Sequence, residues 1–289
     1  MKIIDIIGNT PLVEIQGFHQ NEEVKLYAKL EGQNPGGSVK DRPAHYMVKL
    51  AIERGDITKN TKLIEATSGN TGIALAMIAG QYKLPIEIAL PKNSTKERIV
   101  AMEAYGAQII LLDSMEACRD YVEEKGRQKG YFIFNQFANP DNYRSHYETT
   151  APEIWKDTDG QITHFVSAMG TTGTIMGCSR FFKEKNEKIQ IIGCQPQEGS
   201  SIPGIRKWPV EYLPKIYEKE RIDKIIELSE TDARAAAKKM AKDCGIFAGM
   251  SSGGAFHAAV QVANSIEKGT VVFIICDRGD RYSSSDLFD

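Results

Sequence analysis

A lysine directly behind a glycine-rich turn is the first residue of this sequence whose setting suits chemistry. Lys40 follows Asn-Pro-Gly-Gly-Ser-Val at residues 34–39. Glycine lets a backbone approach a ligand closely, and such a turn leaves N–H groups free to bind it. Apolar residues recur at helical spacing from Arg42, so Lys40 is expected at a helix start. The helix dipole and partial burial would lower the pKa of its amine and make it a nucleophile, whereas a solvated lysine is the alternative.

A second glycine-rich segment combines hydroxyl groups with a side-chain amide. Thr67, Ser68, Gly69, Asn70 and Thr71 lie between a predicted strand and a predicted apolar helix. A helix N-terminus has unpaired N–H groups and favours anions, so this set of donors suits a carboxylate. A simple helix cap would explain only one of the hydroxyls. We therefore expect this segment to bind a ligand.

A third segment, Gly170-Thr171-Thr172-Gly173-Thr174, repeats this design in the second half of the chain. Its two glycines would let the backbone wrap a phosphate, and its three hydroxyls add donors at a helix start. The spacing fits neither the P-loop nor the dinucleotide fingerprint. The segment predicts a phosphate that is not part of a nucleotide, with a tight strand–helix turn as the alternative.

The segment Gly249-Met250-Ser251-Ser252-Gly253 satisfies the G-x-S-x-G pattern of serine hydrolases. That chemistry needs an acid and then a histidine after the serine. His257 is the only histidine after Ser251, it is six residues away, and no acid lies between them. A hydrolase is therefore disfavoured, and Ser251 is read as a helix cap or a ligand contact. No metal-ligand spacing links the remaining histidines, which are His19, His45, His146 and His164.

The composition is that of an ordinary soluble globular protein. Of 289 residues, 42% are hydrophobic and 26% are charged, and the net charge of −2 gives no reason to expect nucleic acid or a membrane surface as a partner. The five cysteines are scattered and odd in number, which is typical of reduced thiols. Asp5 and Gly8 interrupt the short apolar N-terminus, so no signal peptide is expected. These features predict a cytoplasmic protein.

Stretches with strand and helix patterns alternate along the chain. Strands are expected at 24–31, 62–66, 85–91, 107–112, 131–134, 163–167, 189–194 and 270–276, and helices from 42, at 73–79, 95–105 and 115–129, from 147, after 174, and at 231–244 and 252–266. This alternation predicts parallel sheets, in which ligands bind beyond the carboxyl ends of the strands. The three glycine-rich loops begin at such ends, so they could converge on one crevice. A loop-like composition at 135–143 places a domain boundary just beyond it.

An amine, a phosphate cradle, a carboxylate cradle and a serine at another helix start together indicate pyridoxal 5'-phosphate. The motifs N-P-G-G-S-V-K-D-R, E-A-T-S-G-N-T-G-I-A-L-A, M-G-T-T-G-T, G-M-S-S-G-G-A and C-D-R-G-D-R-Y occur here in that order. They resemble the motif series of the cysteine synthases, within the tryptophan-synthase-β (fold type II) class of pyridoxal phosphate enzymes. The resemblance extends from Gly8 to Tyr282, and the segments 195–209 and 276–282 are most similar to the B-type isozymes.

The resemblance implies an α/β fold with two three-layer αβα domains, mainly parallel twisted sheets, and the cofactor in the cleft between the domains. Residues 1–145 would form the domain that carries Lys40 and the substrate loop. Residues 146–289 would form the domain that carries the phosphate loop and Ser251. The first segment, to about residue 35, is expected to pack on the second domain. A homodimer is also implied.

The resemblance further assigns roles to individual residues. Lys40 would form the Schiff base and then serve as the acid–base group at the substrate Cα. Asn70 would bond the phenolic oxygen of the cofactor, and Ser251 its pyridine nitrogen, with Ser252 and Asp277 as alternatives. The phosphate would lie on Gly170, Thr171, Thr172, Gly173 and Thr174, and the amino acid carboxylate on Thr67, Ser68, Thr71 and Gln136.

The implied reaction is β-replacement on O-acetyl-L-serine by sulfide, or by thiosulfate to give S-sulfocysteine, through an α-aminoacrylate intermediate in L-cysteine biosynthesis. Arg206 is a candidate for steering an anionic donor or an O-phosphoserine substrate, because a guanidinium suits oxyanions; the alternative is a surface arginine. A serine or threonine dehydratase, or another β-eliminating lyase of the same fold, is the competing function. A catalytically idle binding protein is disfavoured, because Lys40, Asn70 and Ser251 are all present.

Overall fold

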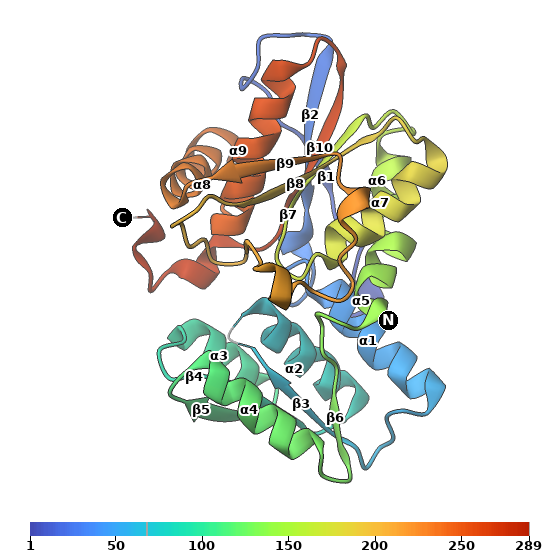
Figure 1. Ribbon diagram of the computed structural model, residues 1–289, viewed down its shortest axis with the longest axis vertical. Helices are drawn as coiled ribbons and strands as arrows, with labels where there is room; N and C mark the ends of the chain where they lie inside the picture. Colours follow the sequence, from blue (N-terminus) through green and yellow to red (C-terminus); the bar gives the residue numbers. More distant parts are fainter. Residues whose placement is uncertain (68, 289) are drawn as a thin grey trace.

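The computed structural model describes residues 1–67 and 69–288. It contains two separate sheets, one in each half of the molecule along its long axis (Figure 1). The larger sheet has the order β1 (Leu12–Glu14), β2 (Val24–Leu30), β10 (Gly269–Ile275), β7 (His164–Ala168), β8 (Gln190–Pro196) and β9 (Lys224–Leu228). The smaller sheet has the order β5 (Gln108–Leu112), β4 (Ile86–Pro91), β3 (Lys62–Ala66) and β6 (Tyr131–Ile133). The strand pairs are parallel except β1 with β2. The expected α/β class with mainly parallel sheets is confirmed.

Helices cover both faces of each sheet, which makes each half three layers thick (Figure 1). The smaller sheet packs on one face against α1 (Asp41–Arg54), α2 (Asn70–Tyr82) and α3 (Lys96–Ala104), and on the other against α4 (Met115–Gly126). The larger sheet packs against α8 (Glu230–Cys244) and α9 (Met250–Ser265) on one face, and against α6 (Ala151–Asp157) and α7 (Gly173–Lys185) on the other. Strands covered on both sides become almost entirely apolar, as β4 and β10 are.

The segment after β6 departs from the expected loop at 135–143 and helix from 147. Helix α5 (Pro140–Ser145) begins inside that segment and continues through a π-helical turn, His146–Thr150, into α6. Its start is explained by Asn139, whose side chain accepts a hydrogen bond from the N–H of Asp141, and by proline at the first helical position. The boundary between residues 145 and 146 remains a prediction.

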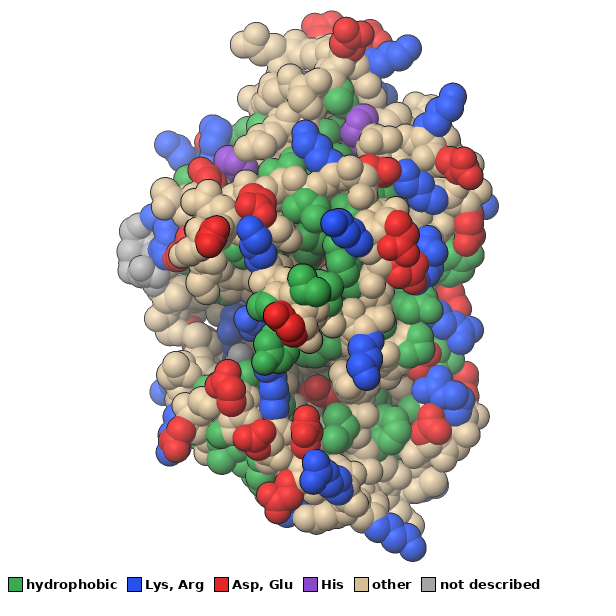
Figure 2. Space-filling view, viewed as in Figure 1, with side chains coloured by type: hydrophobic (Ala, Val, Ile, Leu, Met, Phe, Trp, Pro, Cys, Tyr) green, Lys and Arg blue, Asp and Glu red, His purple; other side chains and the backbone are tan. Residues whose placement is uncertain are grey.

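Strand β9 was not expected from the sequence. It is a short edge strand in which only Ile226 and Leu228 are buried, so its alternation covers too few residues to stand out. On the face in Figure 2, acidic and basic side chains are interspersed over the surface. None of the helices in residues 1–67 and 69–288 is both long and apolar enough to cross a membrane.

Candidate active site

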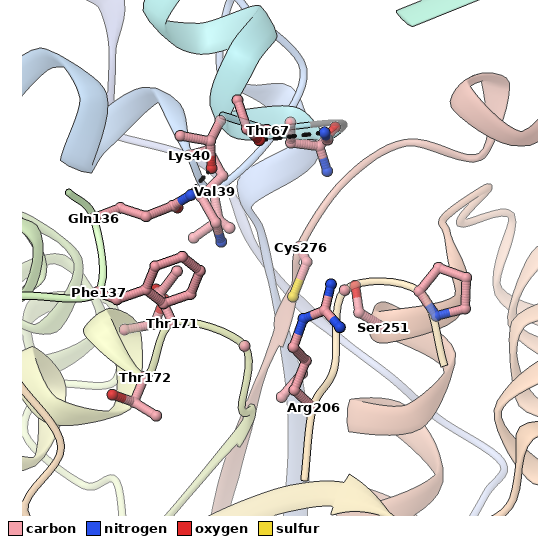
Figure 3. Close-up of a pocket in the computed structure, with 18 of the residues that line it drawn as sticks. Val39, Lys40, Thr67, Gln136, Phe137, Thr171, Thr172, Arg206, Ser251 and Cys276 are labelled. Carbon is pink, nitrogen blue, oxygen red and sulfur yellow. Dashed lines mark hydrogen bonds between the residues drawn. The ribbon is translucent and has the colours of Figure 1, made fainter. Parts of the chain in front are cut away.

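A cavity of about 250 Å³ lies where β2, β3, β7 and β10 end (Figure 3). The segments that follow these four strands all contribute to its wall, as expected for the carboxyl ends of parallel strands. The residues expected at the site that line it are Lys40, Thr67, Asn70, Thr71, Gln136, Gly170, Thr171, Thr172, Thr174, Arg206 and Ser251. Gly173 is not one of the described residues that line it, and Ser68 falls outside the described residues.

Lys40 lies immediately before α1, as the sequence predicted. Its turn is tied to the end of β10, because the N–H of Val39 donates to the carbonyl of Cys276 at 2.8 Å and Ser38 forms a β-bridge with Asp277. Burial lowers the pKa of the Lys40 amine, although the nearby Cys276 and Asp277 act in the opposite direction. A larger fraction of the amine is therefore neutral than in an exposed lysine.

A buried ion network holds the helix that follows Lys40. The guanidinium of Arg42 bonds the Glu31 carboxylate, with Nε 2.6 Å from Oε2, and the Glu153 carboxylate, with Nη1 2.6 Å from Oε1. Thr10 donates its hydroxyl to Glu31, and Lys29 lies 3.0 Å from Glu153. The sequence indicated none of these pairs, since their members are up to 124 residues apart.

Two side chains in the first turn of α2, which follows the segment after β3, form hydrogen bonds with residues from other parts of the chain. The Thr71 hydroxyl donates to Oε1 of Gln136 at 2.8 Å. The amide nitrogen of Asn70 donates to Oδ2 of Asp277 at 2.8 Å, while Oδ1 of Asn70 is buried without a partner among the described residues. The side-chain amide of Asn70 is therefore only partly satisfied by the described residues, at the start of α2.

The loop from Gly170 to Thr174 joins β7 to α7 and is shaped by close approaches of the backbone. A Cβ on Gly173 would lie 1.9 Å from Oδ1 of Asn142, and one on Gly170 would lie 2.8 Å from the carbonyl oxygen of Gly204. Thr172 has the left-handed conformation, with φ of 69°, and its buried hydroxyl lacks a partner among the described residues. This hydroxyl and the N-terminus of the 13-residue α7 suit a phosphate.

Ser251 lies in the first turn of α9 and is 4% exposed. This helix follows α8 rather than a strand. Among the described residues, Ser251 is the part of α9 that lines the cavity. The two alternatives to Ser251 have other roles. Ser252 accepts a hydrogen bond from the N–H of Cys276 at 2.9 Å, and Asp277 accepts hydrogen bonds from Asn70 and from the Tyr282 hydroxyl.

Arg206 lines the cavity (Figure 3). Its guanidinium lies over the ring of Trp208, 5.7 Å from the centroid. Trp208 in turn donates its indole N–H to the carbonyl of Gly170 at 2.8 Å and packs edge-on against Phe137. The neighbouring Lys207 pairs with Glu227 instead. Neither Phe137 nor Trp208 was predicted from the sequence, and the stretch R-K-W-P at residues 206–209 was an available signal for Trp208 only.

These features define an α/β enzyme whose cavity suits a small phosphorylated aldehyde held on a lysine. The Thr172 hydroxyl, which has no partner among the described residues, and the side-chain amide of Asn70 fit the phosphate and a ring oxygen of such a group. The chain belongs to the family described as pyridoxal-phosphate dependent enzymes, whose sequence model matches residues 3–277. The cofactor and the fold type II class expected from the sequence are thereby confirmed.

Comparison with individual proteins indicates which enzymes of this family the chain resembles. The chain is 52% identical to cysteine synthase B of Pseudomonas aeruginosa, over 99% of this chain and 97% of that one. It is 50% identical to cysteine synthase B of Escherichia coli, over 98% and 94% of the two chains. Among solved structures, a cysteine synthase from Entamoeba histolytica matches with a TM-score of 0.95 at 39% identity, over 99% of this chain and 90% of that one. The resemblance to cysteine synthases is confirmed.

Proposed function

We propose that this chain is a cysteine synthase that replaces the acetoxy group of O-acetyl-L-serine with sulfide to form L-cysteine. The observation that carries the proposal is the Lys40 amine of lowered pKa, which lies in one cavity with two separate anion cradles at the starts of α2 and α7. The similarity to cysteine synthase B of two bacteria supports the same reaction.

Four parts of the chain would hold pyridoxal phosphate. Lys40 would bond its aldehyde carbon, residues 170–174 its phosphate, Asn70 its ring oxygen and Ser251 its ring nitrogen. When bound, the cofactor withdraws electrons from the substrate Cα. A serine hydroxyl is neutral, so it does not hold the ring nitrogen fully protonated as an aspartate would. A ring nitrogen that is not fully protonated withdraws electrons less strongly, and this favours elimination over transamination.

The chain's own groups would then move the proton and hold the substrate. Thr67, Ser68, Thr71 and Gln136 would bind the carboxylate, and this fixes the Cα–H bond relative to Lys40. Once the substrate amine has replaced it on the aldehyde carbon, the freed Lys40 amine would take the proton from Cα as acetate leaves Cβ with the electron pair of the C–O bond. Sulfide then forms the new C–S bond at Cβ, and the Lys40 ammonium returns a proton to Cα.

Thiosulfate is the second donor that we propose, with S-sulfocysteine as its product. Arg206 supports this proposal, because its guanidinium lies in the cavity wall and suits the oxyanion end of such a donor. We also propose that the protein is a cytoplasmic homodimer, by similarity to the cysteine synthases, and that its domains divide after residue 145.

The test is the visible absorbance of the purified protein and the products that it forms. O-acetylserine alone should change the absorbance of the bound cofactor, and sulfide or thiosulfate should restore it with release of L-cysteine or S-sulfocysteine. Lys40→Ala should abolish both the change and the product. Keto acid formed from serine or threonine without added sulfide would favour the dehydratase, and turnover by Lys40→Ala would refute the proposed role of the lysine.

A further inference from the structure

A histidine behind the phosphate loop has no part in the reaction described above. His146 is 1% exposed and begins the π-helical turn His146–Thr150 between α5 and α6. Such turns are rare and often accompany functional sites. Helix α7 packs closely on this turn, since a Cβ on Gly177 would lie 2.7 Å from the Cβ of His146.

Both ring nitrogens of His146 have a threonine hydroxyl as partner. Nδ1 lies 2.8 Å from Oγ1 of Thr150, and Nε2 lies 3.3 Å from Oγ1 of Thr174. Thr150 is fully buried, whereas Thr174 lines the cavity as the last residue of the phosphate loop. The three side chains form a row that leads from the interior to the loop.

The direction of the hydrogen bonds in this row follows from counting donors and acceptors. With the ring proton on Nε2, Thr150 donates to Nδ1, Nε2–H donates to Thr174, and only the Thr174 hydroxyl proton is left to point into the cavity. With the proton on Nδ1, Thr174 would donate to the ring, and the Thr150 proton would have no acceptor among the described hydrogen bonds. Because buried donors are almost always paired, the first arrangement is favoured.

The charge state of His146 supports a fixed arrangement. Burial lowers its pKa well below the usual value, and the positive charges of Arg42 and Lys40 lower it further, while Glu153 acts in the opposite direction. The ring is therefore neutral, with one N–H and one acceptor nitrogen. With one donor and one acceptor nitrogen, the neutral ring makes all the hydrogen bonds of the row run in the same direction, from Thr150 to Thr174.

We propose that His146 is a positioning residue that makes the Thr174 hydroxyl a hydrogen-bond donor toward the phosphate of pyridoxal phosphate. The inference rests on the proposed placement of the phosphate on residues 170–174. Phosphate oxygens only accept hydrogen bonds, so an oxygen lone pair of Thr174 turned toward them would repel. Losing one such bond to a charged group weakens binding by about tenfold or more.

Two substitutions of similar size distinguish this role from a structural one. The amide nitrogen of glutamine can take the place of Nε2, and that of asparagine the place of Nδ1. We expect His146→Asn to weaken binding of pyridoxal phosphate by about tenfold and to leave binding of pyridoxal, which lacks the phosphate, nearly unchanged. His146→Gln should retain most of the preference for the phosphorylated form. Titration of the cofactor-free full chain with both compounds measures this preference, and the ³¹P chemical shift of the bound phosphate should move in His146→Asn only.

A double-mutant cycle tests the route through Thr174. Thr174→Val should reduce the preference for pyridoxal phosphate, and His146→Asn should then have little further effect. His164→Asn is the matched control, because His164 forms a similar pair with Thr163, at 2.8 Å, at the far end of β7. If His146→Asn does not fold, Thr150→Val removes the partner of Nδ1 and should reduce the preference more weakly.

The inference is overturned if His146→Asn keeps the wild-type preference, if its effect and that of Thr174→Val are additive, or if the glutamine variant loses as much as the asparagine variant. Each of these outcomes leaves the proposed reaction intact. Conversely, a wild-type chain that binds pyridoxal phosphate through Thr174 but forms no cysteine would refute the proposed reaction and leave the role of His146 standing.

Discussion

Glu65 shows how a single buried side chain near the site responds to pH. It lies in β3, two residues before Thr67, and is 5% exposed. Its carboxylate accepts hydrogen bonds from the N–H groups of Phe134 and Asn135, yet Oε2 has no partner among the described residues. Burial outweighs these two bonds and raises the pKa of Glu65 to about 7. The folded protein therefore holds this proton at a pH where the unfolded chain has released it.

The consequence for stability has a definite sign. Because the folded state binds the extra proton, the free energy of unfolding falls as pH rises from about 4.5 to about 7 and then stays level with respect to this group. Glu65→Gln should remove about 2 kcal/mol of that fall. Urea unfolding at pH 5 and pH 8 measures it. A fall in Glu65→Gln as steep as that of the wild type would contradict the assignment.

At the scale of elements, two glycine-rich loops that look alike in the sequence have different physical requirements. Gly173 begins α7 where α5 crosses it, and a Cβ there would overlap the Asn142 side chain, which holds the loop through bonds to Thr171 and to the carbonyl of Gln136. A Cβ on Gly69, by contrast, would meet no atom of the described residues within 4 Å, its chain neighbours aside. The first glycine is therefore required for packing of two helices.

Alanine at these two positions should separate the two cases. Gly173→Ala should destabilise the protein by about 2 kcal/mol through overpacking, and it should also weaken cofactor binding because the loop must move. Gly69→Ala should change stability by less than about 1 kcal/mol, since space is available and φ is −121°. Urea unfolding of the cofactor-free proteins checks both. Equal losses in the two variants would show that backbone freedom, not the contact with Asn142, is what the glycines supply.

The helices and strands also differ in how well the sequence predicted them. Strong periodic patterns predicted strands such as β3 and β10 and the start of α1, because the spacing of apolar residues depends directly on which side of an element is buried. The glycine-rich loops were predicted to bind ligands because several hydrogen-bond donors are adjacent in the sequence. Strand β9 and helix α5 were missed because their signals are short. Contacts such as Trp208 with Gly170, or His146 with Thr174, depend on packing between distant segments, which no local pattern encodes.

At the scale of the whole molecule, the ion network around Arg42 links the N-terminal segment to α1 and α6. Glu153, from α6, pairs with both Arg42 and Lys29, whose side chains are almost completely buried, and also accepts the N–H of Asn9. These contacts lower the pKa of Glu153 in spite of the burial that opposes them. Because α1 begins directly after Lys40, we expect the network also to help position the proposed catalytic lysine.

Removing Glu153 should therefore damage the molecule far more than a surface ion pair would. Glu153→Ala removes the carboxylate that two buried cations share, so that Arg42 keeps only Glu31 and Lys29 only Asp157, and the expected loss is about 3 kcal/mol of unfolding free energy. Glu148→Ala, on the preceding helical turn, removes the exposed pair with Arg144 and a hydrogen bond with Tyr46, and it should cost less than about 1 kcal/mol. Urea unfolding at pH 7 measures both losses. Where Glu153→Ala still folds, weaker cofactor binding than in Glu148→Ala would show that the network positions Lys40, whereas equal stability of the two variants would mean that the buried cations find other partners or water.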